Sequence, residues 1–402
     1  MKRLSFFIER VPTYILWLFS FLFLRKKNRW CFGSQSGFSA SNTKYLYYKI
    51  LKEHPEIHAA WINPQKDVTY ETLKAKGLPV FYKWSLPGLW FCLTAKVYFY
   101  THGPGDVNFC TSGGTYKVNL WHGVGTKNIE YLAQLSWVNL KNPIHRIIFP
   151  FYCTFHNVLI ATSDSIKKWL SDCFRIPLDS KQFVMANLPR CETSRMSKEE
   201  LERLIHIADE NLLSYIDVAR KHNRVFFYMP TYRQDAENNV LESSKIDFKQ
   251  LNELLVKKND YLFIKLHPRD LKKITKSYDY SNIKIVKDLI DIYLLFPYID
   301  VLITDYSSVY AEYILYKDNV IVFDFDRAEF LKKEQGLYFD FEEFTSAIFA
   351  HDYADLYKLI RDKDSYPVPD KADMMNKYWN RIQETPDLVT EIKKRIGFNY
   401  ER

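Results

Sequence analysis

The 402-residue chain is longer than an ordinary single-core domain and has the length of two. Hydrophobic residues form 47% of it and charged residues 26%, which excludes a largely disordered chain, a collagen and a coiled coil. The net charge of +8 is concentrated in residues 1–30, where seven basic side chains against one acidic give +6, so we do not expect a basic body that binds nucleic acid.

The N-terminus contains an uncharged apolar run at 11–24 (VPTYILWLFSFLFL), followed at once by RKKNR. A membrane-spanning helix requires about 20 apolar residues, so this run is short for a span. We expect residues 1–29 to form an interfacial anchor, with aromatic side chains at the acyl boundary and Arg and Lys on anionic headgroups. A strained single span and an ordinary buried helix remain as alternatives. The stretch 137–155 is either a second membrane contact or a core helix with a proline kink.

Beyond the anchor, short apolar strands alternate with helical runs such as 198–221 and 309–316, a pattern typical of parallel sheets covered on both faces. Strands are predicted at 30–33, 59–62, 97–101, 117–121, 158–161, 183–186, 225–229, 262–266, 301–304 and 320–323. Ten strands are more than one sheet usually contains. The pattern therefore predicts an α/β protein with two doubly wound, Rossmann-like domains, at 30–192 and 193–371, that face a central cleft. A helical tail follows at 372–402.

The six cysteines form no CxxC pair, and no histidine lies at zinc-ligand spacing from them. A chain of this size does not need disulfides, so we expect reduced, mostly buried thiols.

Ligands of open α/β sheets bind at the carboxyl ends of strands, so the residues just after each strand are informative. The first such motif is LWHGVGTK at 120–127. Gly123 and Gly125 permit a ligand to approach the backbone closely, and His122 is either a general base or a hydrogen-bonded structural histidine.

The second motif is PTYR at 230–233, where Pro230 ends an apolar strand. Arg233 there suits a phosphate or carboxylate ligand. An ion pair with Asp235 or Glu237 is the alternative.

The third motif is KLHP at 265–268, again a strand followed by a histidine, His267. Histidines at strand ends in both domains would face the same cleft and suit a diphosphate.

The fourth motif is ITDYSS at 303–308, followed by a helical run. Hydroxyls and free N–H groups at a helix N-terminus can bind an anion, whereas Ser307 or Ser308 can also simply cap the helix. Both roles can coexist.

Other nucleotide and metal motifs are absent from the sequence, including GxxxxGK[ST], GxGxxG and HExxH. Asp324 and Asp326 form a DxD pair after an apolar strand, which is weak support for a metal site. We therefore expect no cofactor. A divalent metal is compatible with the sequence, but no motif indicates one.

Together and in this order, the four motifs resemble those of the CDP-glycerol glycerophosphotransferase family of teichoic-acid and capsule synthesis. The resemblance runs from about Trp30 to Tyr338. It implies a GT-B-like fold and peripheral association with the cytoplasmic side of the cell membrane. Two departures concern 187–192, which read NLPRCE where the family usually has GYPRND, and 345–347, which read TSA where a Pro-Gly pair is common.

Residue by residue, the resemblance implies His122 as the catalytic base, with His267 and Asp305 also in catalytic positions. Asp305 would hold the turn or a donor hydroxyl. The implied substrate-binding residues are Gly123, Lys127, Arg190, Thr231, Arg233, Ser307 and Ser308. The domain 30–192 would be the acceptor side and 193–371 would bind the CDP-activated donor.

The function expected from this resemblance is transfer of glycerol phosphate from CDP-glycerol to a hydroxyl of a lipid-linked acceptor, with release of CMP. The partners would be the donor, a lipid-linked glycan or polyol-phosphate acceptor and the anionic membrane surface, with no nucleic acid. The alternatives are a CDP-ribitol-using ribitolphosphotransferase, a GT-B glycosyltransferase using a nucleotide sugar, and a non-enzymatic membrane-bound scaffold of a polysaccharide assembly complex.

Overall fold

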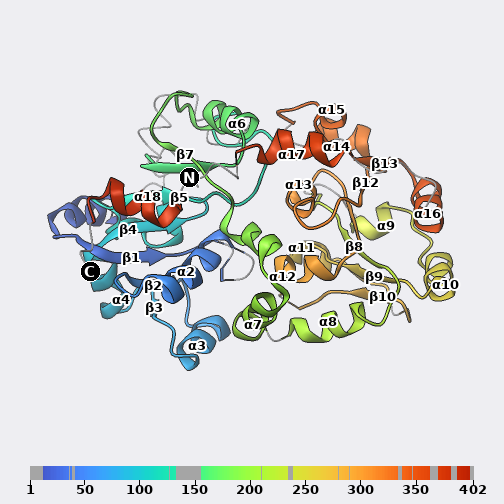
Figure 1. The fold of residues 1–402 in the computed structure, drawn as a ribbon, viewed down its shortest axis with the longest axis horizontal. Helices are drawn as coiled ribbons and strands as arrows, with labels where there is room; N and C mark the ends of the chain where they lie inside the picture. The colour runs from blue at the N-terminus through green and yellow to red at the C-terminus, as the bar shows by residue number, and fades with distance from the viewer. Residues whose placement is uncertain are drawn as a thin grey trace. The chain divides into compact units, whose positions relative to one another are not determined.

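The computed structural model describes residues 12–35, 37–38, 41–125, 127–132, 155–209, 211–233, 239–278, 280–288, 290–333, 337–345, 347–362, 370–381 and 387–398. Within them the chain divides into two compact units (Figure 1). Unit 1 comprises residues 1–122, 130–190 and 381–402, and unit 2 comprises residues 123–129 and 191–380. Most of the predicted second membrane stretch, 137–155, lies outside the described residues; only Phe155 is described.

Unit 1 is built on a seven-stranded sheet in which all neighbouring strands are parallel, in the order β3-β2-β1-β4-β5-β6-β7. The strands are β1 (Lys26–Phe32), β2 (His58–Asn63), β3 (Val80–Tyr82), β4 (Ala95–Tyr100), β5 (Tyr116–Asn119), β6 (Val158–Ala161) and β7 (Phe183–Met185). The order reverses between β1 and β4, which is the switch point of a doubly wound sheet.

The helices of unit 1 are α2 (Asn42–Glu53), α3 (Val68–Ala75), α4 (Leu86–Thr94), α6 (Asp164–Phe174) and α18 (Leu388–Arg395), and residues 12–19 are also helical. The C-terminal α18 returns to unit 1, where it appears in red beside the blue and cyan strands (Figure 1). The Nζ of Lys27 donates to the carbonyl of Gly397 at 2.7 Å, and Lys393 pairs with Glu56. The end of the chain is thus part of the N-terminal unit.

Unit 2 contains a six-stranded parallel sheet in the order β10-β9-β8-β11-β12-β13, with its switch point between β8 and β11. Its strands are β8 (Val225–Met229), β9 (Tyr261–Ile264), β10 (Ile283–Ile285), β11 (Val301–Thr304), β12 (Val320–Phe323) and β13 (Ile348–Ala350). β11 and β12 are buried at every residue, as expected for central strands covered on both faces.

The helices of unit 2 are α7 (Lys198–Ala208), α8 (Leu212–Ala219), α9 (Val240–Ser243), α10 (Phe248–Lys258), α11 (Pro268–Leu271), α12 (Ile292–Leu295), α13 (Val309–Tyr313), α14 (Arg327–Lys333), α15 (Phe341–Thr345), α16 (Tyr353–Arg361) and α17 (Lys371–Trp379). The predicted run 198–221 is therefore two helices, and the run 309–316 is the shorter α13. The seven- and six-stranded parallel sheets confirm the predicted two-sheet α/β architecture.

Candidate functional site

Two strand ends meet at the switch point of unit 2, where Thr231 follows β8 and Asp305 follows β11. The backbone N–H of Thr231 donates to both carboxylate oxygens of Asp305, at 2.9 and 3.0 Å. Asp305 is fully buried. Of the two roles expected for Asp305, holding the turn and binding a donor hydroxyl, the first is visible in these bonds.

Arg233 lies at the centre of this strand-end cluster. Its Nε and Nη2 donate to the two carboxylate oxygens of Asp326 at 2.7 and 3.0 Å, and Nη2 also pairs with Asp305 at 2.9 Å. Nη1 donates to the Thr231 carbonyl at 2.6 Å. Burial alone would lower the pKa of Arg233, but Asp305 and Asp326 together raise it above its ordinary value.

These bonds use most of the N–H groups of Arg233, so its guanidinium chiefly joins the loops that follow β8, β11 and β12. The acidic partners suggested by the sequence, Asp235 and Glu237, lie outside the described residues. The Asp326 partner lies 93 positions away, in the DxD pair.

The DxD pair itself is occupied by protein partners. Asp326 holds Arg233, and Asp324 bonds Nδ1 of His351 at 2.8 Å. Burial raises the pKa of Asp324, and His351 opposes that shift. Among the described residues, there is no cluster of three or more His, Cys, Asp or Glu side chains that could hold a metal ion.

Ser307 and Ser308 follow β11 and precede α13, and both are half-buried. Ser308 occupies the N-cap position of α13 but makes no side-chain cap hydrogen bond. The Ser307 hydroxyl accepts a long bond of 3.4 Å from the backbone N–H of Val309. Capping therefore uses these hydroxyls only weakly, which leaves hydrogen-bonding capacity at this strand end.

His267 occupies the N-cap of α11, where its Nδ1 accepts from the backbone N–H of Arg269 at 3.2 Å. An accepting Nδ1 carries no proton, so the neutral ring has its N–H at Nε2. Partial burial lowers the pKa of His267, and Arg269 lowers it further. The ring lies 4.8 Å from that of Tyr232, over which the Arg269 and Lys273 cations are also positioned. His267 thus presents a neutral N–H donor in basic surroundings.

In unit 1 the second residue of the predicted motif after β5 is strained. Trp121 has φ of 53°, in the left-handed region that a bulky residue adopts at a cost of about 1–2 kcal/mol. Its N–H donates to Asn119 Oδ1 at 2.8 Å, and its carbonyl accepts from Asn42 Nδ2 at 2.8 Å. Nη2 of Arg190 donates to the carbonyl of His122 at 2.8 Å. These bonds hold the turn that presents His122.

The tautomer of His122 follows from one contact. Its Nδ1 lies 3.3 Å from the carbonyl oxygen of Thr101, so Nδ1 carries the proton and Nε2 has a free lone pair. Its ring stacks on that of His102 with centroids 4.2 Å apart. The pKa of His122 is lowered, chiefly by desolvation of the ring and further by the neighbouring His102 and Arg190. His122 is exposed to solvent, and its lowered pKa leaves the ring neutral at pH 7.

His102 and Asp106 lie beside His122, and neither belongs to the four sequence motifs. Oδ2 of Asp106 accepts from the backbone N–H groups of Thr101 and His102, both at 3.0 Å, and lies 3.7 Å from Nδ1 of His102. Asp106 thereby fixes the Thr101 carbonyl that orients His122. The signal was present, because His102 directly follows the predicted strand 97–101.

Gly123 and Lys127 belong to unit 2, whereas His122 belongs to unit 1. The backbone of Lys127 forms an isolated antiparallel β-bridge with that of Leu337, and the Nζ of Lys127 lies 5.2 Å from the ring centroid of Phe330. The guanidinium of Arg233 packs on the same ring at 4.9 Å. The structure thus joins Lys127 to the Arg233 cluster within unit 2, and joins Arg190 to His122 within unit 1.

Comparison with known proteins identifies one family model over most of the chain. The model for CDP-glycerol:poly(glycerophosphate) glycerophosphotransferase matches residues 16–386. The chain is 26% identical over 246 residues to a teichoic acid ribitol-phosphate primase of Bacillus spizizenii, covering 60% of this chain and 59% of that protein. It is 23% identical over 314 residues to a teichoic acid poly(glycerol phosphate) polymerase of Bacillus subtilis, covering 75% and 39%. The chain thus spans only part of these curated relatives.

Among solved structures, the chain resembles the wall teichoic acid polymerase TagF, in a variant soaked with CDPG, with a TM-score of 0.74 at 18% identity. The likeness covers 98% of each chain. It also resembles a co-structure of Staphylococcus aureus MnaA with UDP, with a TM-score of 0.50 at 13% identity, covering 94% and 99%. At these identities the likeness concerns the fold, and it confirms the predicted GT-B-like architecture.

Proposed function

Since the chain belongs to the CDP-glycerol:poly(glycerophosphate) glycerophosphotransferase family, as its motifs predicted, we propose that it transfers glycerol phosphate from CDP-glycerol to an acceptor hydroxyl and releases CMP. The observation that carries this proposal is the family match over residues 16–386, which includes all of the predicted site residues. The acceptor in this proposal is lipid-linked, and the reaction extends or primes a teichoic-acid-like or capsular polymer.

In the proposed reaction, the acceptor oxygen attacks the β-phosphorus that bears glycerol. The bond from that phosphorus to the bridging oxygen breaks, and its electron pair leaves with CMP. Phosphoryl transfer of this kind depends mainly on positioning and on neutralising charge. The donor diphosphate would be held by Nε2–H of His267 and by the hydroxyls of Ser307 and Ser308, with Lys127 adding positive charge.

Arg233 and Asp305 act in this proposal as positioning residues. Their bonds to each other, to Thr231 and to Asp326 keep the loops after β8, β11 and β12 in one arrangement. A donor bound at those loops would meet preorganised groups, so little reorganisation would be needed during the reaction.

His122 would accept the proton of the attacking hydroxyl at Nε2. Its contact with the Thr101 carbonyl supports this role, because that contact leaves the lone pair at Nε2. Its lowered pKa keeps it unprotonated, and therefore competent as a base, at neutral pH.

A second candidate donor is CDP-ribitol. It is favoured by the match to a ribitol-phosphate primase at 26% identity, which is comparable to the 23% identity to a poly(glycerol phosphate) polymerase. The choice between the two donors depends on the polyol contacts of the bound substrate.

We further propose that the protein works at the membrane surface. No helix in the described ranges is both long and apolar enough to cross a bilayer. Several large apolar side chains near the N-terminus are nonetheless exposed: Ile15, Leu16, Leu18, Phe19, Phe21, Leu22 and Leu24. Trp90 of α4, which is 58% exposed, contacts Phe23 and extends this apolar surface. The basic residues Arg25, Lys26 and Lys27 directly follow Leu24, as in an interfacial anchor.

Arg25 attaches this anchor to the fold. Its guanidinium donates to the carbonyls of Cys92 at 2.8 Å and Thr111 at 2.9 Å, and also to that of Gly113. The Ser20 hydroxyl accepts from the N–H of Gly113 at 2.8 Å. β1 begins at Lys26, and the helical residues before Ser20 also contact unit 1, where the rings of Tyr14 and Trp17 lie 5.8 and 6.0 Å from that of Phe109. The exposed apolar side chains therefore belong to a segment that is itself attached to the fold.

The experiment that tests this function measures CMP release from purified full-length protein given CDP-glycerol, CDP-ribitol or a UDP-sugar, with an acceptor bearing glycerol phosphate. We expect acceptor-dependent release of CMP from one of the two CDP-polyols. Release of nucleotide from the UDP-sugar alone would instead indicate a GT-B glycosyltransferase. No release from any donor would favour the scaffold alternative.

A further inference from the structure

A large cavity in unit 1 has no role in the donor chemistry described above. Its volume is about 700 Å³, within the range typical of small-molecule sites. It runs from the loops after β1 and β4, with Ser34 and His102, to the connection between α6 and β7, with Arg175 and Gln182. All of its described lining residues belong to unit 1.

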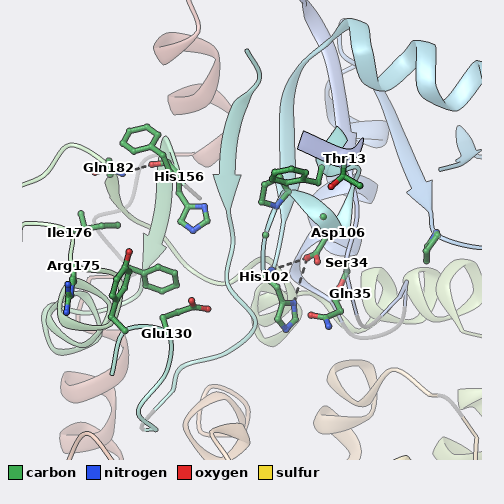
Figure 2. A pocket seen from close by; sticks show the side chains of 18 of the residues that line it. Thr13, Ser34, Gln35, His102, Asp106, Glu130, His156, Arg175, Ile176 and Gln182 are labelled. Carbon is green, nitrogen blue, oxygen red and sulfur yellow. Dashed lines mark hydrogen bonds and ion pairs between the residues drawn. The ribbon is translucent and has the colours of Figure 1, made fainter. Parts of the chain in front are cut away.

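Glu130 is the acidic group of this cavity and is unusual in two respects. In Figure 2 its side chain lies between the wall of Arg175 and Gln182 and the wall of His102. Its φ of 48° lies in the left-handed region, which is energetically unfavourable for every residue except glycine. No hydrogen bond or ion pair joins its carboxyl group to another described residue. Burial raises its pKa to about 7, and His102 opposes the shift.

Arg175 is the basic group of the cavity. It follows α6 in the left-handed C-cap position, with φ of 54°, where glycine or asparagine would be less strained. Its guanidinium is exposed and lies 4.5 Å from the ring centroid of Tyr131. No carboxylate of the described residues pairs with it, so its N–H donors remain available to an anion.

Strain of this kind is concentrated around the cavity. Of the five described non-glycine residues with positive φ, Glu130 and Arg175 line it. A third, Trp121, precedes His122 and packs edge-on against the cavity residue Phe174 at 5.1 Å. Unfavourable backbone conformations persist only where the surrounding structure over-determines them, and they cluster at functional sites.

The cavity also offers aromatic surface and a route to the proposed base. Phe155, which is 64% exposed, and Phe174 line it beside the polar groups. Aromatic faces beside hydrogen-bonding groups suit the carbon backbone and hydroxyls of a polyol or sugar. His102 lines the cavity and stacks on His122 at 4.2 Å, so a ligand filling the cavity would end close to that base.

Building on the proposed function, we propose that this cavity is the acceptor site, and that it binds a polyol phosphate ester. Glu130 accepts hydrogen bonds from the acceptor hydroxyls, Phe155 and Phe174 pack on its carbon chain, and Arg175 pairs with its nearest phosphate. The hydroxyl that reacts then lies at the His102 end of the cavity.

The test measures binding of a short phosphodiester-linked glycerol phosphate oligomer to the full-length protein by calorimetry, without donor. We expect Arg175→Ala and Glu130→Gln each to weaken oligomer binding about 10- to 100-fold, since each removes a charge-assisted or buried hydrogen bond. CDP-glycerol affinity should stay unchanged in both. The matched controls are Arg203→Ala and Glu53→Gln, which alter exposed groups elsewhere and should bind the oligomer like the unmodified protein.

Melting curves establish that each variant is folded, and Phe155→Ala replaces Glu130→Gln if that variant does not fold. Unchanged oligomer affinity in the folded cavity variants would overturn the proposal, as would an equal loss in the controls. Because calorimetry needs no turnover, it tests the cavity even if CMP release fails, and CMP release tests the reaction independently of the cavity.

Discussion

Replacing Arg233 by alanine should strongly destabilise unit 2. The change removes a buried guanidinium that is bonded to Asp305, Asp326 and the Thr231 carbonyl. Asp305 would then be a buried carboxylate without its cationic partner. Removing one partner of a buried ion pair typically costs about 3–5 kcal/mol. For a unit of this size, each kcal/mol lowers the melting temperature by about 2–4 °C, so we expect a decrease of roughly 6–20 °C.

The assay is calorimetric and denaturant unfolding of the full-length protein, in which the transition of unit 2 should move and that of unit 1 should not. Arg233→Lys keeps the charge but cannot donate two hydrogen bonds to one carboxylate. Its melting temperature should therefore lie between those of the unmodified protein and Arg233→Ala. The control is Arg220→Ala, which removes an exposed ion pair with Glu202 and should cost less than about 1 kcal/mol.

The reasoning would be refuted if Arg233→Ala melted like the Arg220→Ala control while its affinity for CDP-glycerol collapsed. That result would mean that Arg233 binds the donor directly and that its ion pairs contribute little to stability.

Three further predictions concern catalysis, acid stability and the membrane. His122→Asn should lower kcat about 10²- to 10⁴-fold with little effect on donor affinity, whereas His267→Asn should mainly weaken CDP-glycerol binding; the reverse pattern would exchange their roles. His156, buried and bonded to Tyr100, has its pKa lowered to about 3 by burial and by Lys117. Only the unfolded chain therefore takes up its proton between about pH 6.5 and 3, and stability should fall there with acid by up to about 1.4 kcal/mol per pH unit. His156→Gln should reduce this dependence of stability on pH, whereas His58→Gln, which changes an exposed histidine, should not. Equal pH dependence in the two variants would count against a neutral, buried His156. Replacing the exposed Leu18 and Leu22 by Glu should preserve the unfolding transitions, because neither side chain is buried in the fold, but should strongly reduce binding to anionic vesicles; unchanged vesicle binding would count against the anchor.

Strongly apolar central strands could be predicted from the sequence almost to the residue. The predictions for 158–161, 225–229, 301–304 and 320–323 coincide with β6, β8, β11 and β12. The strands that were not predicted are β3, β10 and β13, each three residues long and at the edge of its sheet. A short edge strand has one neighbour and weak apolar patterning, so its sequence resembles a loop.

Candidate site residues can be proposed from the sequence where a polar side chain directly follows a strand. His122, His267 and Asp305 are candidates on that rule, whereas the partners that set their hydrogen bonding could not be predicted from it. The bond between Arg233 and Asp326 joins residues 93 positions apart, and the left-handed turn at Trp121 depends on Asn42, which is distant in sequence. Such contacts are set by tertiary packing, which local patterns do not record. His102 was missed although the same rule applied to it.

The central claim, transfer of a polyol phosphate, is tested most directly by the mass of the product formed on a defined acceptor. Purified full-length protein would be incubated with CDP-glycerol and an acceptor that ends in glycerol phosphate, and the product would be analysed by mass spectrometry. The claim predicts an acceptor that has gained whole glycerol phosphate units, with one CMP released for each unit, and no such product from the His122→Asn variant. An unmodified acceptor, or one that gains a sugar from a nucleotide sugar instead, would contradict it.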